Sequence, residues 1–171
     1  FWLLRAFLRL ETERMRRRGV RLQFIGRRYR LQPIVLKAME SAERATIQGT
    51  QLVASVAIDY SSRHAITQAA LDATRSFSLA RNPVPYSPEP HLLRALMAET
   101  GDVDLLIRTG GEKRLSDFLL WELAYAELLF TDCMWPDFDE TAFDEALAEF
   151  SHRQRRFGAL PEVATVPPAA A

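Results

Sequence analysis

The sequence has 171 residues, of which 48% are hydrophobic and 26% are charged, and its formal net charge is zero. A single cysteine, Cys133, excludes an intramolecular disulfide, and the sequence has no run of 18 apolar residues that could cross a bilayer. These features predict one globular domain in the cytoplasm.

The zero net charge hides an uneven distribution along the chain. Residues 1–63 carry thirteen Lys or Arg and five Asp or Glu, whereas residues 99–171 carry six and fifteen. Such polarity could bring an anionic ligand to one side of the protein. For most of these residues we favour charge matching between packed elements instead, and we do not expect nucleic acid as a partner.

The first half of the chain alternates between helical and strand-like patterns. Apolar residues at helical spacing predict an amphipathic helix that ends at Gly19, and the alternating segment VRLQFIG predicts a strand. A second helix is expected at 33–48, with Pro33 in its first turn. The apolar segment 51–60 predicts a buried strand, and a helix is expected to start near His64.

The second half continues the pattern after a proline-rich loop at 83–90. A short helix is expected from His91, and a buried strand at 102–109. The next apolar segment is ambiguous, and we predict a short helix at 117–124 followed by a strand at 127–131. Asp139 is the expected N-cap of a last helix, and residues 159–171 are expected to form a disordered tail.

Strands separated by helices predict an α/β fold with a mostly parallel central sheet and helices on both faces. In such folds, ligands bind at the loops that leave the carboxyl ends of the strands. Arg63 and Arg108 each follow a predicted strand. Two arginines at separate strand exits therefore indicate a candidate anion site.

The densest group of hydrogen-bond donors lies in the segment RTGGEKRLS, residues 108–116. Its glycines permit backbone conformations that bring amide groups close to a ligand, and the guanidinium groups of Arg108 and Arg114 and the hydroxyl of Ser116 can all donate to it. Two planar guanidinium groups suit a diphosphate better than a lone carboxylate. From composition alone, a turn with surface charges explains the segment equally well.

Several other kinds of active site lack support in the sequence. The phosphate-binding patterns GxxxxGK[ST] and GxGxxG are absent, as are HExxH, paired cysteines and GxSxG. The three histidines are dispersed, and we interpret each as a surface or packing residue. The aromatic residues Trp121, Tyr125 and Phe130 end apolar segments, which favours a place in the core over a place in the site.

At these residues the chain resembles the cis-prenyltransferases, the undecaprenyl diphosphate synthase family. The segment that carries the resemblance is DLLIRTGGEKRLSDFLLWELAYAELLFTDCMWPDFDE, and GVRLQFIG, AIDYSSRHAI and RRFG occur in the expected order around it. The resemblance covers residues 1–158. Asp117 stands where asparagine is usual in the family, and Ser61 and Ser62 stand where a glycine pair is frequent.

The resemblance implies that isopentenyl diphosphate is added to an allylic diphosphate such as farnesyl diphosphate, giving a long polyprenyl diphosphate. It implies a homodimer, and peripheral membrane association through the lipid product. It also implies roles for single residues: Arg108, Arg114 and Ser116, with Gly110 and Gly111, for isopentenyl diphosphate; Glu127 for Mg²⁺ across the dimer contact; and Arg63, Arg156 and Gly158 as support. From the residues alone, Glu127 could equally pair with an arginine.

The chemistry of this reaction agrees with such a site. Breaking the allylic carbon–oxygen bond leaves a cation and a departing diphosphate, so catalysis needs positive charge more than a strong base. The growing chain must leave water, and a tunnel between apolar faces would stabilise it by about 0.8 kcal/mol per buried methylene.

The family's MDGNGRWA segment, whose aspartate is central to metal binding and ionisation, is not in the sequence. We therefore expect an N-terminally truncated family fold with an exposed sheet edge, no catalytic aspartate, and little or no activity of this chain alone. A non-catalytic partner subunit and a bare diphosphate-binding fragment are the alternative hypotheses.

Overall fold

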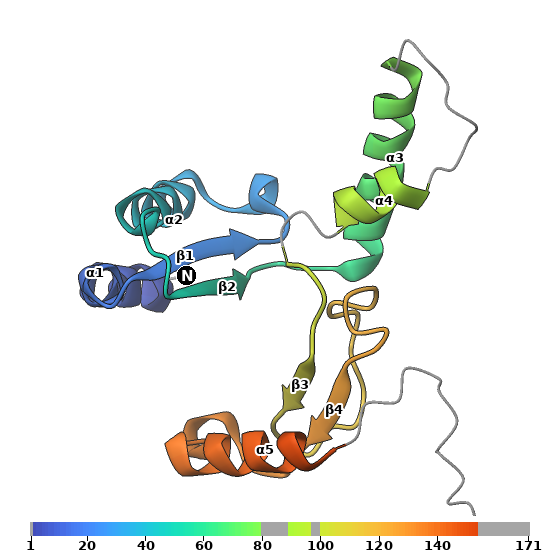
Figure 1. The fold of residues 1–171 in the computed structure, drawn as a ribbon. Coiled ribbons are helices and arrows are strands. Elements are labelled where there is room, and N and C mark those ends of the chain that lie inside the picture. The colour runs from blue at the N-terminus through green and yellow to red at the C-terminus, as the bar shows by residue number, and fades with distance from the viewer. Residues whose placement is uncertain (1, 80–88, 97–99, 154–171) are drawn as a thin grey trace, which may run out of the picture. The chain divides into compact units, whose positions relative to one another are not determined.

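The computed structural model describes residues 2–79, 89–96 and 100–153 (Figure 1). Its contacts divide the chain into two compact units. The first comprises Phe1–Asp102 and Leu115–Ala124, and the second comprises Val103–Arg114 and Tyr125–Ala171. Residues 83–88 of the predicted loop, the predicted tail at 159–171, Arg156 and Gly158 lie outside the described residues.

The first unit begins with the predicted helix, strand, helix and strand. These are α1 (Trp2–Arg17), β1 (Val20–Ile25), α2 (Pro33–Thr46) and β2 (Leu52–Ala57), with a short 3₁₀ helix, η1 (Arg28–Arg30), before α2. The two strands are parallel, and their register runs from Val20 opposite Leu52 to Ile25 opposite Ala57. Parallel strands joined by a helix confirm the predicted α/β class.

The core of this part of the unit forms where α1 and α2 pack on β1. Leu8 of α1, Leu22 and Phe24 of β1, and Val35 and Met39 of α2 are all buried. The alternation predicted for β1 is therefore confirmed, because its buried residues Leu22 and Phe24 share one face.

Hydrogen bonds from β1 to side chains of α2 fix the strand against the helix. The N–H of Leu22 donates to Thr46 Oγ1 at 3.0 Å, and the N–H of Phe24 donates to Glu43 Oε1 at 2.9 Å. Backbone donors that β2 does not reach are thereby satisfied, which removes a free edge on this side of β1.

The prediction that β2 is buried is wrong, because none of its residues is fully buried. Leu52 and Val53 have 59% and 53% of their surface exposed. Within the described part of the chain β2 pairs only with β1. Its other edge therefore has no strand partner among the described residues.

The first unit continues with α3 (Ser62–Leu79) and α4 (Glu89–Leu96). Both helices were predicted, and they bury Ala69 and Ala73 of α3 and Leu96 of α4. No described helix is both long enough and apolar enough to span a membrane.

The helix predicted at 117–124 is wrong. This segment forms a series of turns, and Ser116, Asp117 and Leu119 adopt left-handed backbone conformations with φ of 51°, 64° and 44°. A right-handed helix cannot continue through such residues. The apolar pattern that suggested a helix reflects burial instead, because Leu119 and Leu123 are buried in the turns.

The second unit contains β3 (Leu105–Arg108), β4 (Glu127–Phe130), the 3₁₀ helix η2 (Trp135–Asp137) and α5 (Glu140–His152). β3 and β4 are parallel, with Leu105 opposite Glu127 and Arg108 opposite Phe130. Asp139 caps α5 as predicted, since its carboxylate accepts the N–H of Ala142 at 3.0 Å.

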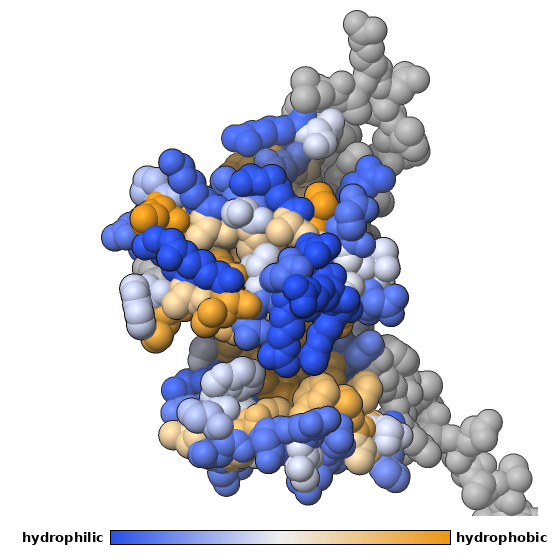
Figure 2. Space-filling model, turned by 90° about the vertical axis from the view of Figure 1, so that its left-hand side faces the viewer, coloured by the Kyte–Doolittle hydropathy of each residue, from blue (hydrophilic) through white to orange (hydrophobic). Residues whose placement is uncertain are grey.

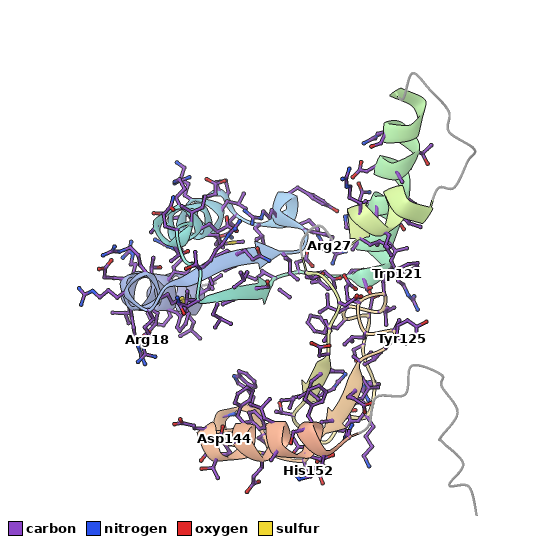
Figure 3. All side chains as sticks on the ribbon, viewed as in Figure 1. Arg18, Arg27, Trp121, Tyr125, Asp144 and His152 are labelled. Carbon is purple, nitrogen blue, oxygen red and sulfur yellow. The ribbon has the colours of Figure 1, made fainter. Side chains whose placement is uncertain are left out.

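Large apolar side chains remain on the surface of both units, and orange patches are visible among the charged side chains (Figure 2). Tyr125 is 75% exposed and Trp121 is 38% exposed, so the expectation of a core position is wrong for both (Figure 3). Phe130 is partly buried.

We predict that Met39→Ala lowers the free energy of unfolding by about 2–5 kcal/mol, because Met39 is only 1% exposed and its truncation leaves a cavity among α1, β1 and α2. Urea denaturation measures this change. Ile34→Ala on the same helix is the matched control, since Ile34 is 50% exposed and its loss should cost under about 1 kcal/mol. Equal losses in the two variants would contradict this account of the core.

Candidate functional site

The two arginines of the segment RTGGEKRLS lie at opposite ends of one loop in the second unit. Arg108 is the last residue of β3, and Arg114 is the last residue of the loop within this unit. The guanidinium of Arg108 donates through Nη1 to the carbonyl oxygen of Arg114. The side chain of Arg108 therefore reaches across the loop to the backbone of Arg114.

The guanidinium of Arg114 forms an ion pair with Glu112 of the same loop. The side chains of Arg114 and Glu112 are 64% and 48% exposed, so water screens this pair and its contribution is small. An anionic ligand with two phosphate groups offers the guanidinium of Arg114 more acceptor oxygens than the single carboxylate of Glu112. Such a ligand can therefore replace that carboxylate. The pairing with Glu112 therefore leaves the Arg114 guanidinium exposed and weakly held.

The glycines of the loop have a different role from the one expected. Both have positive φ, 85° at Gly110 and 75° at Gly111. The N–H of Gly110 donates to the carbonyl of Cys133 and the N–H of Gly111 donates to the carbonyl of Thr131, both at 2.9 Å. Both amides are therefore engaged in hydrogen bonds within the unit. The glycines instead allow the loop to fold back against the segment after β4.

Ser116 and Arg63, two further predicted site residues, both lie in the first unit. Arg63 is in the first turn of α3, and Ser116 begins the series of turns described above. Asp117, next to Ser116, binds the start of α3: its Oδ1 accepts the N–H of Arg63 at 3.0 Å and its Oδ2 accepts the Ser61 hydroxyl at 2.7 Å. The structure thus connects two segments that are 54 residues apart in the chain.

The contacts of Asp117 also set its charge. The hydrogen bond from the Ser61 hydroxyl, followed by that from the N–H of Arg63, lowers the pKa of the Asp117 carboxyl below its usual value. Both hydrogen bonds favour the ionised form. Sequence reasoning noticed Asp117 only as a departure from the family's asparagine and assigned it no role.

Glu127, the predicted metal ligand, is the first residue of β4. Its Oε2 accepts a hydrogen bond from Arg153 Nη1 at 3.0 Å, and both side chains are 29% exposed. Arg153 also donates to the carbonyl of Leu128 at 3.1 Å and pairs with Glu149. The alternative that Glu127 pairs with an arginine is therefore confirmed.

Metal binding would need more ligands than Glu127. Among the residues that the structure describes, no group of three or more His, Cys, Asp or Glu side chains is arranged to hold a metal ion. A carboxylate has about four lone-pair sites, so the contact with Arg153 leaves Glu127 able to accept further bonds. Mg²⁺ typically takes one or two carboxylates and completes its shell with substrate phosphates and water. Glu127 fits that limited role.

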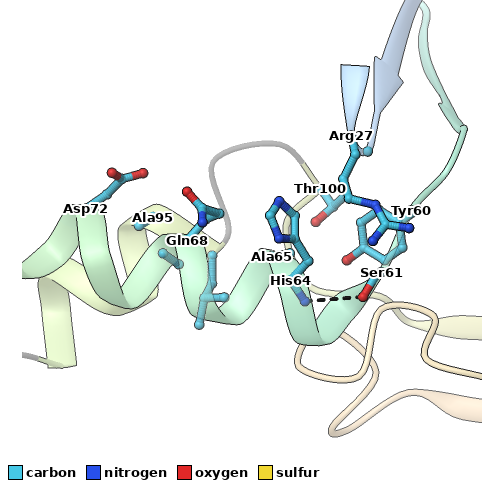
Figure 4. Close-up of a pocket in the computed structure, with 12 residues that line it drawn as sticks. Arg27, Tyr60, Ser61, His64, Ala65, Gln68, Asp72, Ala95 and Thr100 are labelled. Atoms are coloured by element: carbon cyan, nitrogen blue, oxygen red, sulfur yellow. Dashed lines mark hydrogen bonds between the residues drawn. The ribbon is translucent and has the colours of Figure 1, made fainter. Parts of the chain in front are cut away.

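A cavity of about 400 Å³ lies in the first unit, between the end of β1 and α3 (Figure 4). Its polar lining includes Arg27, Tyr60, His64 and Gln68. Arg27 pairs with Asp59 at 2.6 Å, and the backbone N–H of His64 donates to Ser61 Oγ at 3.2 Å. The ring of His64 lies 6.1 Å from that of Tyr29, which suits the predicted packing role.

Comparison with known proteins identifies the family. Residues 1–158 match the prenyltransferase family model described as "Putative undecaprenyl diphosphate synthase". The chain belongs to this family. The resemblance that the sequence analysis draws from RTGGEKRLS and the residues around it is therefore confirmed.

Relatives of known name support this assignment. The chain is 48% identical over 163 residues to isoprenyl transferase 1 of Bradyrhizobium diazoefficiens, covering 94% of this chain and 63% of the relative. It is 45% identical over 161 residues to a ditrans,polycis-undecaprenyl-diphosphate synthase, (2E,6E)-farnesyl-diphosphate specific, of Pseudomonas aeruginosa, covering 91% and 62%. The chain thus spans about three fifths of the length of the curated relatives that it matches.

Solved structures of the family share this fold. One is titled as a probable undecaprenyl diphosphate synthase from Campylobacter jejuni, with a TM-score of 0.80 and 34% identity over 92% of this chain and 72% of that one. Another is lavandulyl diphosphate synthase from Lavandula x intermedia in complex with dimethylallyl diphosphate, with a TM-score of 0.82 and 30% identity over 91% and 68%. The α/β fold predicted from the sequence is that of a cis-prenyltransferase.

We predict that Gly110→Ala lowers the free energy of unfolding by roughly 1–2 kcal/mol, because a side chain at φ of 85° is strained in the left-handed region. The added Cβ itself has room, since its nearest neighbour, Met134 Sδ, would be 3.8 Å away. Chemical denaturation measures the loss. Gly110→Asn is the control and should lose less, because asparagine tolerates this conformation; a larger loss for asparagine would refute the backbone explanation.

Proposed function

We propose that this chain acts as a cis-prenyltransferase that condenses isopentenyl diphosphate with an allylic diphosphate such as farnesyl diphosphate to give a long-chain polyprenyl diphosphate. Membership of the family supports the proposal, as does the farnesyl-diphosphate specificity in the names of several relatives. The observation that carries it is the loop at the carboxyl end of β3, where the guanidinium of Arg108 contacts the backbone carbonyl of Arg114.

Arg108 and Arg114 are the proposed ligands of the isopentenyl diphosphate. In the structure their guanidinium groups contact a carbonyl oxygen and a single exposed carboxylate. A diphosphate would replace these contacts with bidentate hydrogen bonds from the two guanidinium groups to its charged oxygens. Binding by the planar forks would also orient the substrate, so that its double bond meets the allylic carbon.

The reaction is a substitution at the allylic carbon. The carbon–oxygen bond of the allylic diphosphate breaks, the double bond of isopentenyl diphosphate forms the new carbon–carbon bond, and a proton is then lost to leave a cis double bond. Positive charge near the departing diphosphate lowers the barrier, because negative charge develops there in the transition state.

Further parts of the proposal follow from the family resemblance. Ser116 donates its hydroxyl to the isopentenyl diphosphate, and Gly110 and Gly111 shape its loop, with Arg63, Arg156 and Gly158 as support. The enzyme is a cytoplasmic homodimer whose lipid product, a precursor of the cell wall lipid carrier, associates it peripherally with the membrane. Mg²⁺ is the proposed cofactor and adds positive charge at the diphosphates; Glu127 would hold it after exchanging its contact with Arg153.

A second candidate function is a subunit that binds isopentenyl diphosphate without turning it over. One observation favours it: the Glu127 carboxylate is engaged by Arg153. The two candidates differ in one measurable property. Both bind isopentenyl diphosphate, whereas only the enzyme makes polyprenyl product.

We predict that Arg108→Ala weakens isopentenyl diphosphate binding by about 100-fold, because a charge-assisted, bidentate contact is lost. Calorimetric titration of the chain measures the affinity, and chromatography of products formed with Mg²⁺, farnesyl diphosphate and labelled isopentenyl diphosphate measures turnover. Arg75→Ala is the control, since Arg75 is an exposed arginine on α3 that pairs with Asp72. Unchanged affinity in Arg108→Ala would reject the proposed site.

We predict that Glu127→Gln abolishes the gain in isopentenyl diphosphate affinity that Mg²⁺ produces in the unmodified chain, because an amide oxygen is a weaker ligand for this hard cation than a carboxylate. Titrations with and without Mg²⁺ measure the gain. Glu149→Gln is the matched control, since Glu149 contacts the same arginine, Arg153. If Glu127→Gln retained the full Mg²⁺ effect, Glu127 would not be the metal ligand.

A further inference from the structure

Asp117 holds a turn of the first unit against the start of α3. We propose that Asp117 is a positioning residue for isopentenyl diphosphate binding: its contacts fix the turn that carries Ser116 to the first residues of α3, which carry Arg63. The proposal rests on the proposed function, because Ser116 and Arg63 are site residues only if this chain binds the diphosphate.

The attachment consists of four hydrogen bonds between the turn and residues 61–63. Two of them end on the Asp117 carboxylate, from the Ser61 hydroxyl and the Arg63 N–H. In the third, the N–H of Ser62 donates to the carbonyl of Asp117 at 3.0 Å. In the fourth, the N–H of Leu120 donates to Ser62 Oγ at 2.9 Å, and Ser62 is only 1% exposed. Bonds on both sides of a short turn leave it little freedom.

The same contacts satisfy the free backbone donors at the start of α3. A helix leaves its first N–H groups without partners in the helix. Here the N–H of Ser62 donates to the Asp117 carbonyl, that of Arg63 donates to the Asp117 carboxylate, and that of His64 donates to Ser61 Oγ. Ser61 is thus the local cap, and Asp117 completes the capping from a distant part of the chain.

Charge favours this arrangement as well. The first turn of α3 contains no acidic residue, although the positive end of a helix dipole favours one. Asp117 places a carboxylate there, close to Arg63 and Arg27, whose charges contribute to its lowered pKa. The carboxylate is therefore ionised at neutral pH and remains an acceptor for both donors.

The backbone next to Asp117 depends on this attachment. Ser116 and Asp117 both have left-handed φ, which is disfavoured for residues other than glycine and less so for aspartate and asparagine. Such conformations persist when surrounding contacts determine them. Loss of the Asp117 contacts would release Ser116 to other conformations, and its hydroxyl would no longer have one fixed position from which to donate to a phosphate oxygen.

The test is a double-mutant cycle on isopentenyl diphosphate affinity, measured by calorimetry on the full chain. We expect Asp117→Ala to weaken binding about tenfold, and Ser116→Ala to weaken it by a similar factor. If Asp117 acts through Ser116, the double variant should bind no more weakly than Ser116→Ala alone. Asp117→Asn should bind within about threefold of the unmodified chain, since an amide can accept from Arg63 and donate to Ser61.

Two controls separate this role from general loss of structure. Asp72→Ala removes an aspartate of α3 that pairs with the exposed Arg75. This variant should bind isopentenyl diphosphate with unchanged affinity. Circular dichroism reports whether each variant folds. If Asp117→Ala does not fold, Ser61→Ala removes one contact of the carboxylate, and its weakening should likewise vanish in the Ser116→Ala background.

The outcomes distinguish this inference from the function on which it rests. If the unmodified chain does not bind isopentenyl diphosphate, the proposed function fails and the inference fails with it. If the chain binds and Arg108→Ala abolishes binding, but Asp117→Ala binds normally or its effect adds fully to that of Ser116→Ala, only the positioning role is overturned.

Discussion

Two arginines can bind one diphosphate only if the loop between them keeps one shape, and in this protein backbone hydrogen bonds impose that shape. The amides of Gly110 and Gly111 donate to carbonyls of the segment after β4, and the carbonyl of Arg108 accepts the N–H of Thr131 at 2.9 Å. Three bonds therefore hold the loop on the end of the β3–β4 pair. The role that we propose for the glycines is therefore indirect, through the loop conformation that they permit.

In the first unit a similar constraint acts on the residues that follow the loop. The turn at 115–124 has no regular secondary structure of its own, and its attachment to α3 comes from Asp117, Ser62 and their partners. The position of a side chain on such a turn is fixed only as firmly as the contacts that hold the turn. This is why Asp117, which touches no proposed ligand, matters to the account of Ser116.

Charged side chains of the proposed site form ion pairs that a bound substrate would have to replace. Arg114 pairs with the exposed Glu112, and Glu127 pairs with Arg153, so both of these charged groups have a partner within the second unit. These ion pairs are partly exposed and contribute little to the stability of the fold, so breaking them costs little free energy. A diphosphate, with more charge and more oxygens, competes well against them.

Most of the fold could be predicted from the sequence, because local patterns determine it. The alternation in β1, Pro33 at the start of α2 and Asp139 before α5 each predicted an element that the structure contains. The segment 117–124 could not be predicted, because its left-handed residues depend on contacts with residues 61–63, more than 50 positions earlier. The sequence leaves two roles open for Glu127, a ligand of Mg²⁺ or the partner of an arginine. Its pairing with Arg153 is visible only in the folded structure.

The candidate site was predicted in part for the same reason. Arg108, Arg114 and the glycines stand together in the sequence, so their chemistry could be recognised directly. The use of the glycine amides and the role of Asp117 involve partners far along the chain, which no local pattern reveals.

The most direct test of the central claim is an experimental structure of the chain with isopentenyl diphosphate bound. The account predicts that the guanidinium groups of Arg108 and Arg114 both lie within hydrogen-bonding distance of oxygens of the same diphosphate. A diphosphate bound elsewhere, or held while either guanidinium points away from it, would contradict the account.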